Sequence, residues 1–454
     1  MSPTPSPQQR PLLSDRVESA VLLQAYNWHS WRTRHTPFFR HLESKSHDIK
    51  RAGIDAVWLP PCSKSVSPQG YMPMNLYELN SEYGSESDLR RCVQALKDQE
   101  VDVLADIVIN HRCAEFQNAD GIYNVFGGRL CWDDTAIVSN DEAFRGKGNR
   151  SDFKLFEGAP NIDHSQEFVR RDLIEWMRWM RDDVGFDGFR FDFMTGIDPV
   201  HMREYFARLG TDVCIGEYWD SMAYEGTALN YDQNAHRQRI VDWIDRSGQR
   251  ALAFDMTTKG VLQEALKNGE YWRLADKDNQ PPGVLGWWKS RSVTFLDNHD
   301  THRDSQNHWP FPVEHVLERY AYILTHPGVQ MVYWDDLCRD HTLVVITALS
   351  RLRNEAGINA SSVVRILEAS DRRYSAVIDD TLRVTLGATV YKSREDTEHD
   401  DRVLFVTDRV LIERVRRSSA IHRSSRRSSA LSYSYDASPR ISREEVERAA
   451  SAGA

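Results

Sequence analysis

The sequence predicts an α/β fold: a (β/α)8 TIM barrel with an excursion domain after strand 3 and a small C-terminal antiparallel β domain. Eight short apolar runs alternate with longer amphipathic stretches, which is typical of parallel strands joined by helices. The chain has 454 residues, enough for one large barrel and an accessory domain. Because eight strand–helix repeats favour closure into a barrel, an open doubly wound sheet is the weaker alternative.

The eight expected strands are short and rich in apolar residues. They are expected at 21–26, 56–61, 103–110, 188–193, 213–219, 251–256, 292–298 and 329–334. Between them, apolar residues at helical spacing predict helices over 86–99, 166–184 and 314–326. One connection is unusually long, because about 55 residues rich in Gly, Asp and Asn follow the third strand. A loop of that length is typically functional or a small domain of its own.

These patterns divide the chain into segments. The expected segments are a disordered N-terminus (1–19), the barrel (20–110 and 165–345), the excursion domain (111–164), the C-terminal β domain (346–415) and a disordered Arg/Ser-rich tail (416–454). After about residue 391 the strand pattern is lost, and residues 401–415 restore one strand or two. An error in the gene model for this C-terminal part is an open alternative.

Composition excludes several classes of protein. With 57 Lys and Arg against 67 Asp and Glu, the net charge is −10, so no nucleic-acid partner is expected. No run of about 18 apolar residues predicts a membrane helix, and no apolar segment at the N-terminus predicts a secretory signal. We therefore expect a cytoplasmic monomer, with the plastid as an alternative location. The six cysteines are scattered and predict no disulfide framework.

The fourth expected strand carries charges on one face. In GFRFDF, Phe189, Phe191 and Phe193 share one face, and Arg190 and Asp192 share the other. The aromatic face suits the helix layer of a barrel. Buried charges are costly unless they are paired, so the Arg and the Asp are expected to pair with each other or with neighbours. Such a pair marks either a structural ion pair or, near the end of the strand, a functional site.

Three further strand ends carry polar side chains toward the same face of the barrel. They contribute Asp106, Asn110 and His111, then Glu217, then His299 and Asp300. Several carboxylates beside an Arg and two His, without a Cys/His cluster, favour glycoside hydrolysis, in which one carboxylate attacks and another donates a proton. The HExxH, GxSxG, Walker A and GxGxxG motifs are absent, so the chemistries that they serve lack support.

The motifs at these strand ends resemble those of a known family. The four motifs are DIVINH (106–111), GFRFDF (188–193), IGEYW (215–219) and FLDNHD (295–300). Longer phrases such as LLQAYNWHSW (22–31) and GWWKSRSVTFLDNHDT (286–301) are similar to the plant type of the α-amylase family, glycoside hydrolase family 13. This resemblance covers about residues 20–390 and implies endo-hydrolysis of α-1,4-glucosidic bonds in starch and related glucans, with retention of configuration.

The resemblance also implies roles for individual residues. Asp192 matches the nucleophile, Glu217 the general acid/base and Asp300 the third carboxylate. The implied substrate-binding residues are Tyr71, His111, Arg190 and His299 in the cleft, with Trp287 and Trp288 as a starch-binding pair on the surface. A 4-α-glucanotransferase on the same fold and a catalytically silent glucan-binding protein remain as alternatives.

A structural calcium ion is the cofactor that the resemblance implies. The matching metal positions are Asn110, Asp152, Asn161 and Gly196, the last through its backbone carbonyl. Asn161 stands where the plant-type proteins usually carry an Asp. Because calcium prefers charged oxygen ligands, an amide at this position is expected to weaken its binding.

Overall fold

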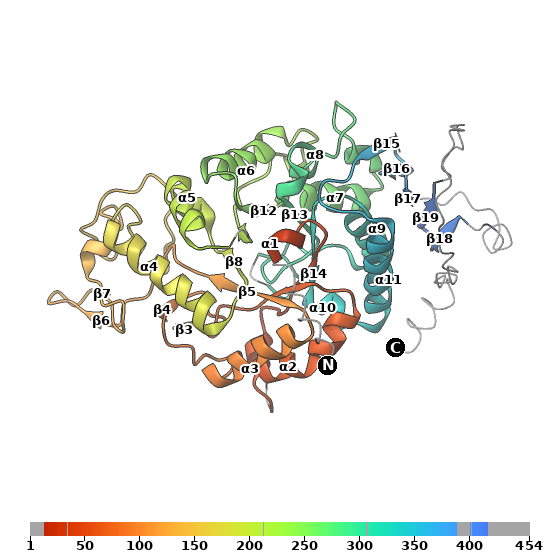
Figure 1. Cartoon of the computed structure of the whole chain (residues 1–454). Helices are drawn as coiled ribbons and strands as arrows, with labels where there is room; N and C mark the ends of the chain where they lie inside the picture. Colours follow the sequence, from red (N-terminus) through yellow and green to blue (C-terminus); the bar gives the residue numbers. More distant parts are fainter. Residues whose placement is uncertain are drawn as a thin grey trace, which may run out of the picture.

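The computed structural model describes residues 13–415, apart from residues 34, 212, 306, 388–399 and 401. In this part of the chain, eight parallel strands form a closed barrel in the order β1-β14-β13-β12-β9-β8-β5-β2. The longer helices lie around the barrel (Figure 1). The predicted (β/α)8 barrel is thereby confirmed, and the open doubly wound sheet is excluded.

Every expected barrel strand is present, but most are shorter than the apolar run that predicted them. The strands are β1 Val21–Gln24, β2 Ala56–Trp58, β5 Asp102–Ile107, β8 Gly188–Phe191, β9 Cys214–Gly216, β12 Leu252–Phe254, β13 Ser292–Phe295 and β14 Val329–Tyr333. Their residues are buried on both faces, as expected for a parallel sheet covered by helices. The last residues of several apolar runs therefore belong to the loops at the carboxyl ends of the strands.

Capping residues and apolar residues at helical spacing account for the outer helices. They are α2 Phe38–Arg51, α3 Glu86–Asp98, α4 Glu167–Trp179, α5 Pro199–Arg208, α6 Asn234–Arg246, α7 Met256–Asn268, α9 Val316–Thr325 and α11 Asp340–Ala356. Helix α3 begins at a capping box in which Ser85 and Asp88 satisfy each other's backbone N–H groups. The three predicted helices are confirmed, and the segment 166–184 ends in a π-helical turn, Met180–Val184. Short helices α8 Val284–Trp287 and α10 Trp334–Leu337 lie in the connections.

The long connection between β5 and α4 protrudes at one end of the molecule (Figure 1). It contains one antiparallel pair, β6 Phe116–Gln117 with β7 Tyr123–Val125. Two other small pairs lie in barrel loops, β3 Lys64–Ser65 with β4 Pro73–Asn75 and β10 Tyr224–Glu225 with β11 Ala228–Leu229. The excursion is joined to the end of β5 by a bridge between His111 and Asn161.

Five antiparallel strands form the C-terminal sheet. In the order β15-β16-β17-β19-β18 they are β15 Val364–Ala369, β16 Arg373–Ile378, β17 Leu382–Gly387, β19 Val410–Arg414 and β18 Val403–Val406. The segment 401–415 thus supplies two strands. The sheet docks on helix α9, because Arg409 Nε lies 2.7 Å from Glu318 Oε2 and the Tyr374 hydroxyl 2.9 Å from His326 Nε2. The tail 416–454 lies outside the described residues.

Two expected segment boundaries are wrong. Residues 13–16 form a helix, α1 Leu13–Arg16, in which Leu13 is buried and Arg16 pairs with Asp102 at the start of β5. The polar composition of residues 1–19 concealed this contact, and residues 1–12 lie outside the described residues. The expected border at 345/346 falls inside α11, which packs against α9 as part of the barrel and ends at Ala356.

None of the helices formed by the described residues is long and apolar enough to cross a membrane.

Candidate active site

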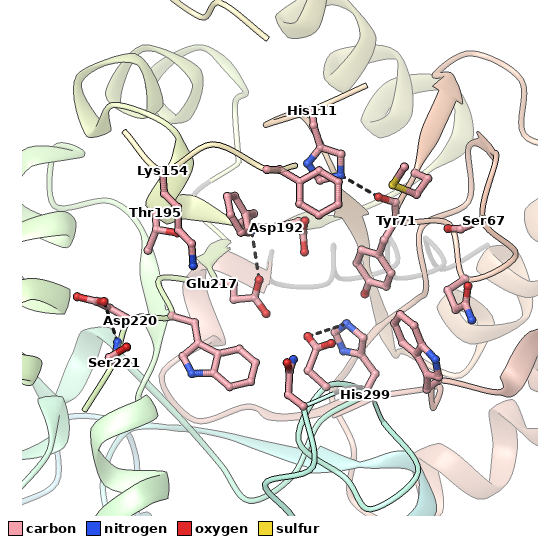
Figure 2. Close-up of a pocket in the computed structure, with 18 residues that line it drawn as sticks. Ser67, Tyr71, His111, Lys154, Asp192, Thr195, Glu217, Asp220, Ser221 and His299 are labelled. Atoms are coloured by element: carbon pink, nitrogen blue, oxygen red, sulfur yellow. Dashed lines mark hydrogen bonds and ion pairs between the residues drawn. The ribbon is translucent and has the colours of Figure 1, made fainter. Parts of the chain in front are cut away.

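The carboxyl ends of the barrel strands surround a cavity of about 560 Å³. Because all eight strands are parallel, the loops that follow them meet at one end of the barrel, and side chains from distant segments converge there. The predicted residues Tyr71, His111, Asp192, Glu217, His299 and Asp300 all line this cavity. Figure 2 shows Asp192 and Glu217 between two walls, one bearing Tyr71 and the other Lys154.

Arg190 lies beneath the cavity floor and is completely buried. Its Nη1 is 2.9 Å from Asp106 Oδ1 and 2.8 Å from Asp192 Oδ1, and its Nη2 is 2.6 Å from Glu217 Oε1. The expectation that Arg190 and Asp192 pair is therefore confirmed. These four residues form what we call the Arg190 cluster, which compensates the buried guanidinium with carboxylates from three strand ends.

Asp106 anchors the Arg190 cluster to an aromatic wall. Its second carboxylate oxygen accepts hydrogen bonds from Trp58 Nε1 (3.0 Å), the Tyr26 hydroxyl (3.1 Å) and the Tyr71 hydroxyl (2.7 Å). Asp106 is buried and is not among the residues that line the cavity. Asp106 thus fixes Arg190 and Tyr71 relative to each other.

Glu217 follows β9 directly and has a raised pKa. A side chain at the preceding Gly216 would place its Cβ 2.1 Å from the Trp243 ring, so only glycine fits there. Burial, reinforced by the charges of Asp192 and Asp300, raises the pKa of Glu217 well above its usual value. Its Oε2 accepts a hydrogen bond from the backbone N–H of Phe193 at 3.2 Å. The raised pKa favours the protonated form of Glu217, which suits this side chain to donate a proton.

Asp300 and His299 follow β13, which only β12 separates from Glu217's strand β9. His299 Nε2 is 3.2 Å from Asp300 Oδ2, and His299 Nδ1 is 2.9 Å from Gln24 Nε2. Burial, together with the positive charge of Arg190, lowers the pKa of His299 well below its usual value, so its imidazole is neutral. The His299 ring stacks on Tyr71 with ring centroids 4.9 Å apart and planes 7° apart.

His111 forms the upper edge of the cavity. Its Nε2 is 2.9 Å from the backbone oxygen of Tyr71, and its ring stacks on Phe156 with centroids 3.9 Å apart. Burial lowers the pKa of His111. A neutral His and an aromatic ring at one edge offer hydrogen bonds and apolar contact without adding charge.

The expectation for Phe193 is wrong. Strand β8 ends at Phe191, and Phe193 adopts a left-handed backbone conformation with φ of 54°. Its ring therefore leaves the face shared by Phe189 and Phe191 and lines the cavity instead. The left-handed turn also aims the N–H of Phe193 at Glu217.

Several lining residues escaped the sequence analysis. They are Trp28, Ser67, Gln69, Met72, Lys154, Phe156, Thr195, Trp219, Asp220, Ser221 and Asn307. Most lie in loops, whose course depends on tertiary packing rather than on periodicity. Two had a usable signal: Trp28 in QAYNWHSW and Trp219 in IGEYW are aromatic residues just beyond a strand end.

Trp287 and Trp288 lie away from this cavity. Trp287 ends helix α8 and is 43% exposed, with the Arg237 guanidinium 3.6 Å from its ring centroid. Trp288 is half-buried and packs against the core. The two indoles thus differ in exposure.

The four predicted metal positions do not all converge. Asn110 Nδ2 lies 3.4 Å from Asn161 Oδ1, and Gly196 lies so near that a Cβ there would be 2.1 Å from Asn110 Oδ1. The side chain of Asp152 is 89% exposed and lies 3.5 Å from Arg150, apart from this group. The buried carboxylate near Asn161 belongs to Asp141, which accepts bonds from the Asn161 backbone N–H (2.9 Å) and Nδ2 (2.8 Å). Among the described residues, no three His, Cys, Asp or Glu side chains form a metal site.

Comparison with known proteins gives two extensive sequence matches. The chain is 47% identical over 370 residues to "Probable alpha-amylase 2" of Arabidopsis thaliana, which covers 81% of this chain and 88% of that protein. It is 45% identical over 372 residues to "Alpha-amylase 3, chloroplastic" of the same plant, covering 82% of this chain. The chain spans only 42% of the length of that second relative.

A family model and a solved structure agree with these matches. The model described as the catalytic domain of alpha amylase matches residues 42–211. An α-amylase from Malbranchea cinnamomea superposes with a TM-score of 0.61 at 19% identity, covering 82% of this chain and 86% of that one. At this identity the structural likeness shows the fold alone.

The raised pKa of Asp300 predicts a pH-dependent contribution to stability. Burial, together with the charges of Asp192 and Asp106, raises this pKa from 3.8 to about 7. Between pH 3.8 and about pH 7 the folded protein keeps a proton on Asp300 that the unfolded chain loses. The stability that this proton contributes to the folded state is therefore full below about pH 4 and lost by about pH 7. Asp300→Asn abolishes the titration. We therefore compare the melting temperature of Asp300→Asn with that of the unaltered protein at each pH. The variant's melting temperature minus that of the unaltered protein should be larger at pH 8 than at pH 5.

The control is Asp220→Asn, which removes a carboxylate from the same cavity, one that pairs with Arg239 at 2.5 Å. Its melting-temperature difference should change less between the two pH values than that of Asp300→Asn. A difference for Asp300→Asn that is the same at both pH values would contradict the assigned direction of the pKa shift.

Proposed function

The chain belongs to the α-amylase family of glycoside hydrolases, as its sequence motifs predicted, and we propose that it cleaves α-1,4-glucosidic bonds within starch and related glucans. The observation that carries this proposal is the Arg190 cluster at the floor of the cavity, where Asp192 and Glu217 share one guanidinium and Asp300 faces them. Carboxylates with different protonation states around one site are what glycoside hydrolysis requires.

In the proposed reaction Asp192 is the nucleophile. Its carboxylate attacks the anomeric carbon of the bound glucose unit, and a covalent bond forms as the bond to the leaving oxygen breaks. Arg190, 2.8 Å from Asp192, supplies the positive charge that favours a negatively charged carboxylate there. The same ion pair fixes the direction of the attacking oxygen.

Glu217 is the proposed acid and base. Its raised pKa keeps a proton on the carboxyl, and that proton passes to the glycosidic oxygen as the leaving sugar departs. The resulting carboxylate then takes a proton from water, which attacks the anomeric carbon and releases Asp192. Two displacements at one carbon give retention of configuration.

The remaining predicted residues are proposed to hold the sugar ring. Asp300, His299 and His111 offer acceptors and donors to its hydroxyl groups, and Tyr71 offers an aromatic face. Burial lowers the pKa of both imidazoles and favours their neutral form. They can therefore bind hydroxyl groups without adding positive charge beside Asp192 and Glu217. The aromatic stack of Tyr71 on His299 restricts the ring position.

Substitution of the two carboxylates tests these roles. Glu217→Gln keeps the size of the side chain but has no proton to donate, and Asp192→Asn removes the attacking charge. Each should lower kcat on soluble starch by about two to four orders of magnitude while starch binding is retained. Asp220→Asn, a matched change in the same cavity, should alter kcat by no more than a few-fold. Either variant keeping a tenth of the original turnover would refute its role.

We also propose that calcium binds where the excursion meets the barrel. Asn110, Asn161, Asp141 and the backbone carbonyl of Gly196 would hold it, with Asp141 in place of the predicted Asp152. The donor set supports this, because Asp141 is a buried carboxylate that, within the described residues, accepts side-chain hydrogen bonds only from N–H groups of Asn161. A buried carboxylate is costly without a cation, and oxygen donors suit calcium. With a single carboxylate the expected affinity is low.

Adding a second carboxylate tests the calcium proposal. Asn161→Asp places two negative charges side by side, so in a chelator its melting temperature should fall below that of the unaltered protein. Added calcium should raise the melting temperature of both proteins, and the half-saturating concentration should be lower for the variant. Asp152→Asn, a control at the exposed position, should leave the calcium response unchanged. Melting curves that do not respond to calcium would remove the ion from this proposal.

Trp287 and Trp288 are proposed as a starch-binding surface outside the cleft. Arg237 covers one face of the Trp287 ring, and the exposed remainder is available to a glucose ring. Trp287→Ala should lower adsorption to starch granules by up to about tenfold. Trp288→Ala should also lower the melting temperature, because this indole packs against the core. Turnover of a short soluble maltooligosaccharide by Trp287→Ala should stay unchanged. An equal loss on both substrates would contradict a separate surface site.

The location and assembly are likewise proposals. We infer a cytoplasmic or plastid monomer that acts without nucleic acid. The relative named as chloroplastic supports the plastid.

A further inference from the structure

The two walls of the cavity differ in character. The wall with Tyr71 and His299 is a stack of rings that also includes Trp28, whose centroid lies 6.2 Å from that of Tyr71. The opposite wall carries Lys154, Thr195, Asp220 and Ser221, and Glu217 lies between this wall and Asp192 (Figure 2). On the proposed function, the acid must stand beside the oxygen of the departing sugar. The wall with Lys154 therefore faces the leaving sugar.

The backbone of Lys154 is fixed relative to the catalytic acid. Its N–H donates to the backbone oxygen of Thr195 at 3.2 Å, in the turn Met194–Gly196 that follows β8. A Cβ at Gly196 would lie 2.8 Å from the Lys154 carbonyl, so the two segments touch there. That turn begins directly after Phe193, whose N–H binds Glu217. A short rigid path thus connects Lys154 to the acid.

The Lys154 side chain is exposed to the cavity and carries an unpaired charge. Its Nζ lies 5.4 Å from the centroid of the Phe193 ring, and no ion pair to it is found in the part of the chain that the structure describes. The carboxylates around it are already engaged, Asp192 and Glu217 by Arg190 and Asp220 by Arg239. Lys154 is the only lysine or arginine among the described residues that line the cavity.

We propose that Lys154 is a specificity-determining residue that binds hydroxyl groups of the leaving glucose unit, the first sugar on the reducing-end side of the cleaved bond. An ammonium group has three donors and sugar hydroxyls accept hydrogen bonds, so the pairing is chemically direct. This role rests on the proposed function and extends it, because it names the side of the cleft where the excursion selects the substrate.

The experiment compares two substrates that offer different groups on the leaving side. Maltoheptaose places glucose units on both sides of the cleaved bond, whereas a chloronitrophenyl maltotrioside releases an aryl group without sugar hydroxyls. Lys154→Met keeps the chain length and removes the donors. It should lower kcat/KM on maltoheptaose about tenfold, the loss typical of one charged hydrogen bond, and change that on the aryl substrate less than twofold.

Further variants and measurements complete the test. Lys154→Arg restores a charged donor and should recover most of the maltoheptaose activity, and end-labelled maltoheptaose should show a shifted cleavage position for Lys154→Met. Lys147→Met is the matched control, because Lys147 lies in the same excursion but pairs with Asp134 outside the cavity. Melting temperatures of all variants exclude a folding defect, and Lys154→Gln replaces the Met variant if that one is unstable.

The outcomes separate the two proposals. Equal losses on both substrates, or no loss on maltoheptaose, would overturn the assignment of Lys154 while leaving the hydrolase proposal intact. An unaltered protein that cleaves neither starch nor the aryl substrate would instead overturn the proposed function itself.

Discussion

The Arg190 cluster is the constraint on which the rest of the site depends. A guanidinium with no exposed surface is tolerable only because carboxylates from β5, from the end of β8 and from the end of β9 all contact it. Removing the charged partner of a buried ion pair typically costs about 3–5 kcal/mol. The barrel therefore cannot relax around this point, and the directions of Asp192 and Glu217 are set before any substrate arrives.

The same cluster divides the protons among the carboxyl groups. One positive charge cannot neutralise every acid near it, and burial raises the pKa of Glu217 well above its usual value and that of Asp300 to about 7. Burial raises the pKa of Asp106 as well, and three hydrogen bonds from Trp58, Tyr26 and Tyr71 hold its carboxyl group in place. The opposed protonation states that glycoside hydrolysis needs thus follow from one buried cation and unequal surroundings.

The periodicity of the sequence predicted the strands and the charged residues at their ends, but it did not predict the positions of residues in loops. Eight apolar runs predicted the barrel because parallel strands covered by helices must be apolar on both faces. Alternation along β8 correctly placed Arg190 and Asp192 together, yet it failed at Phe193, where a left-handed residue ends the strand. Asp152, which the resemblance to the family implied as a metal ligand, lies in a loop and faces solvent instead. The strands within residues 402–415 depend on pairing with β17, and the register of that pairing cannot be predicted from the local sequence.

The excursion links the proposed calcium ligands to the proposed acid, Glu217, through very few residues. Asn110 closes on Gly196, where the absence of a side chain allows the two segments to meet, and the turn that contains Gly196 starts next to Phe193. The N–H of Phe193 holds Glu217, and the Thr195 carbonyl holds the backbone of Lys154. Whatever fixes Asn110 and Asn161 therefore also fixes the distance between the acid and the wall that faces the leaving sugar. A long insertion at this strand end thus shapes the cleft, while the barrel beneath it supplies the charges.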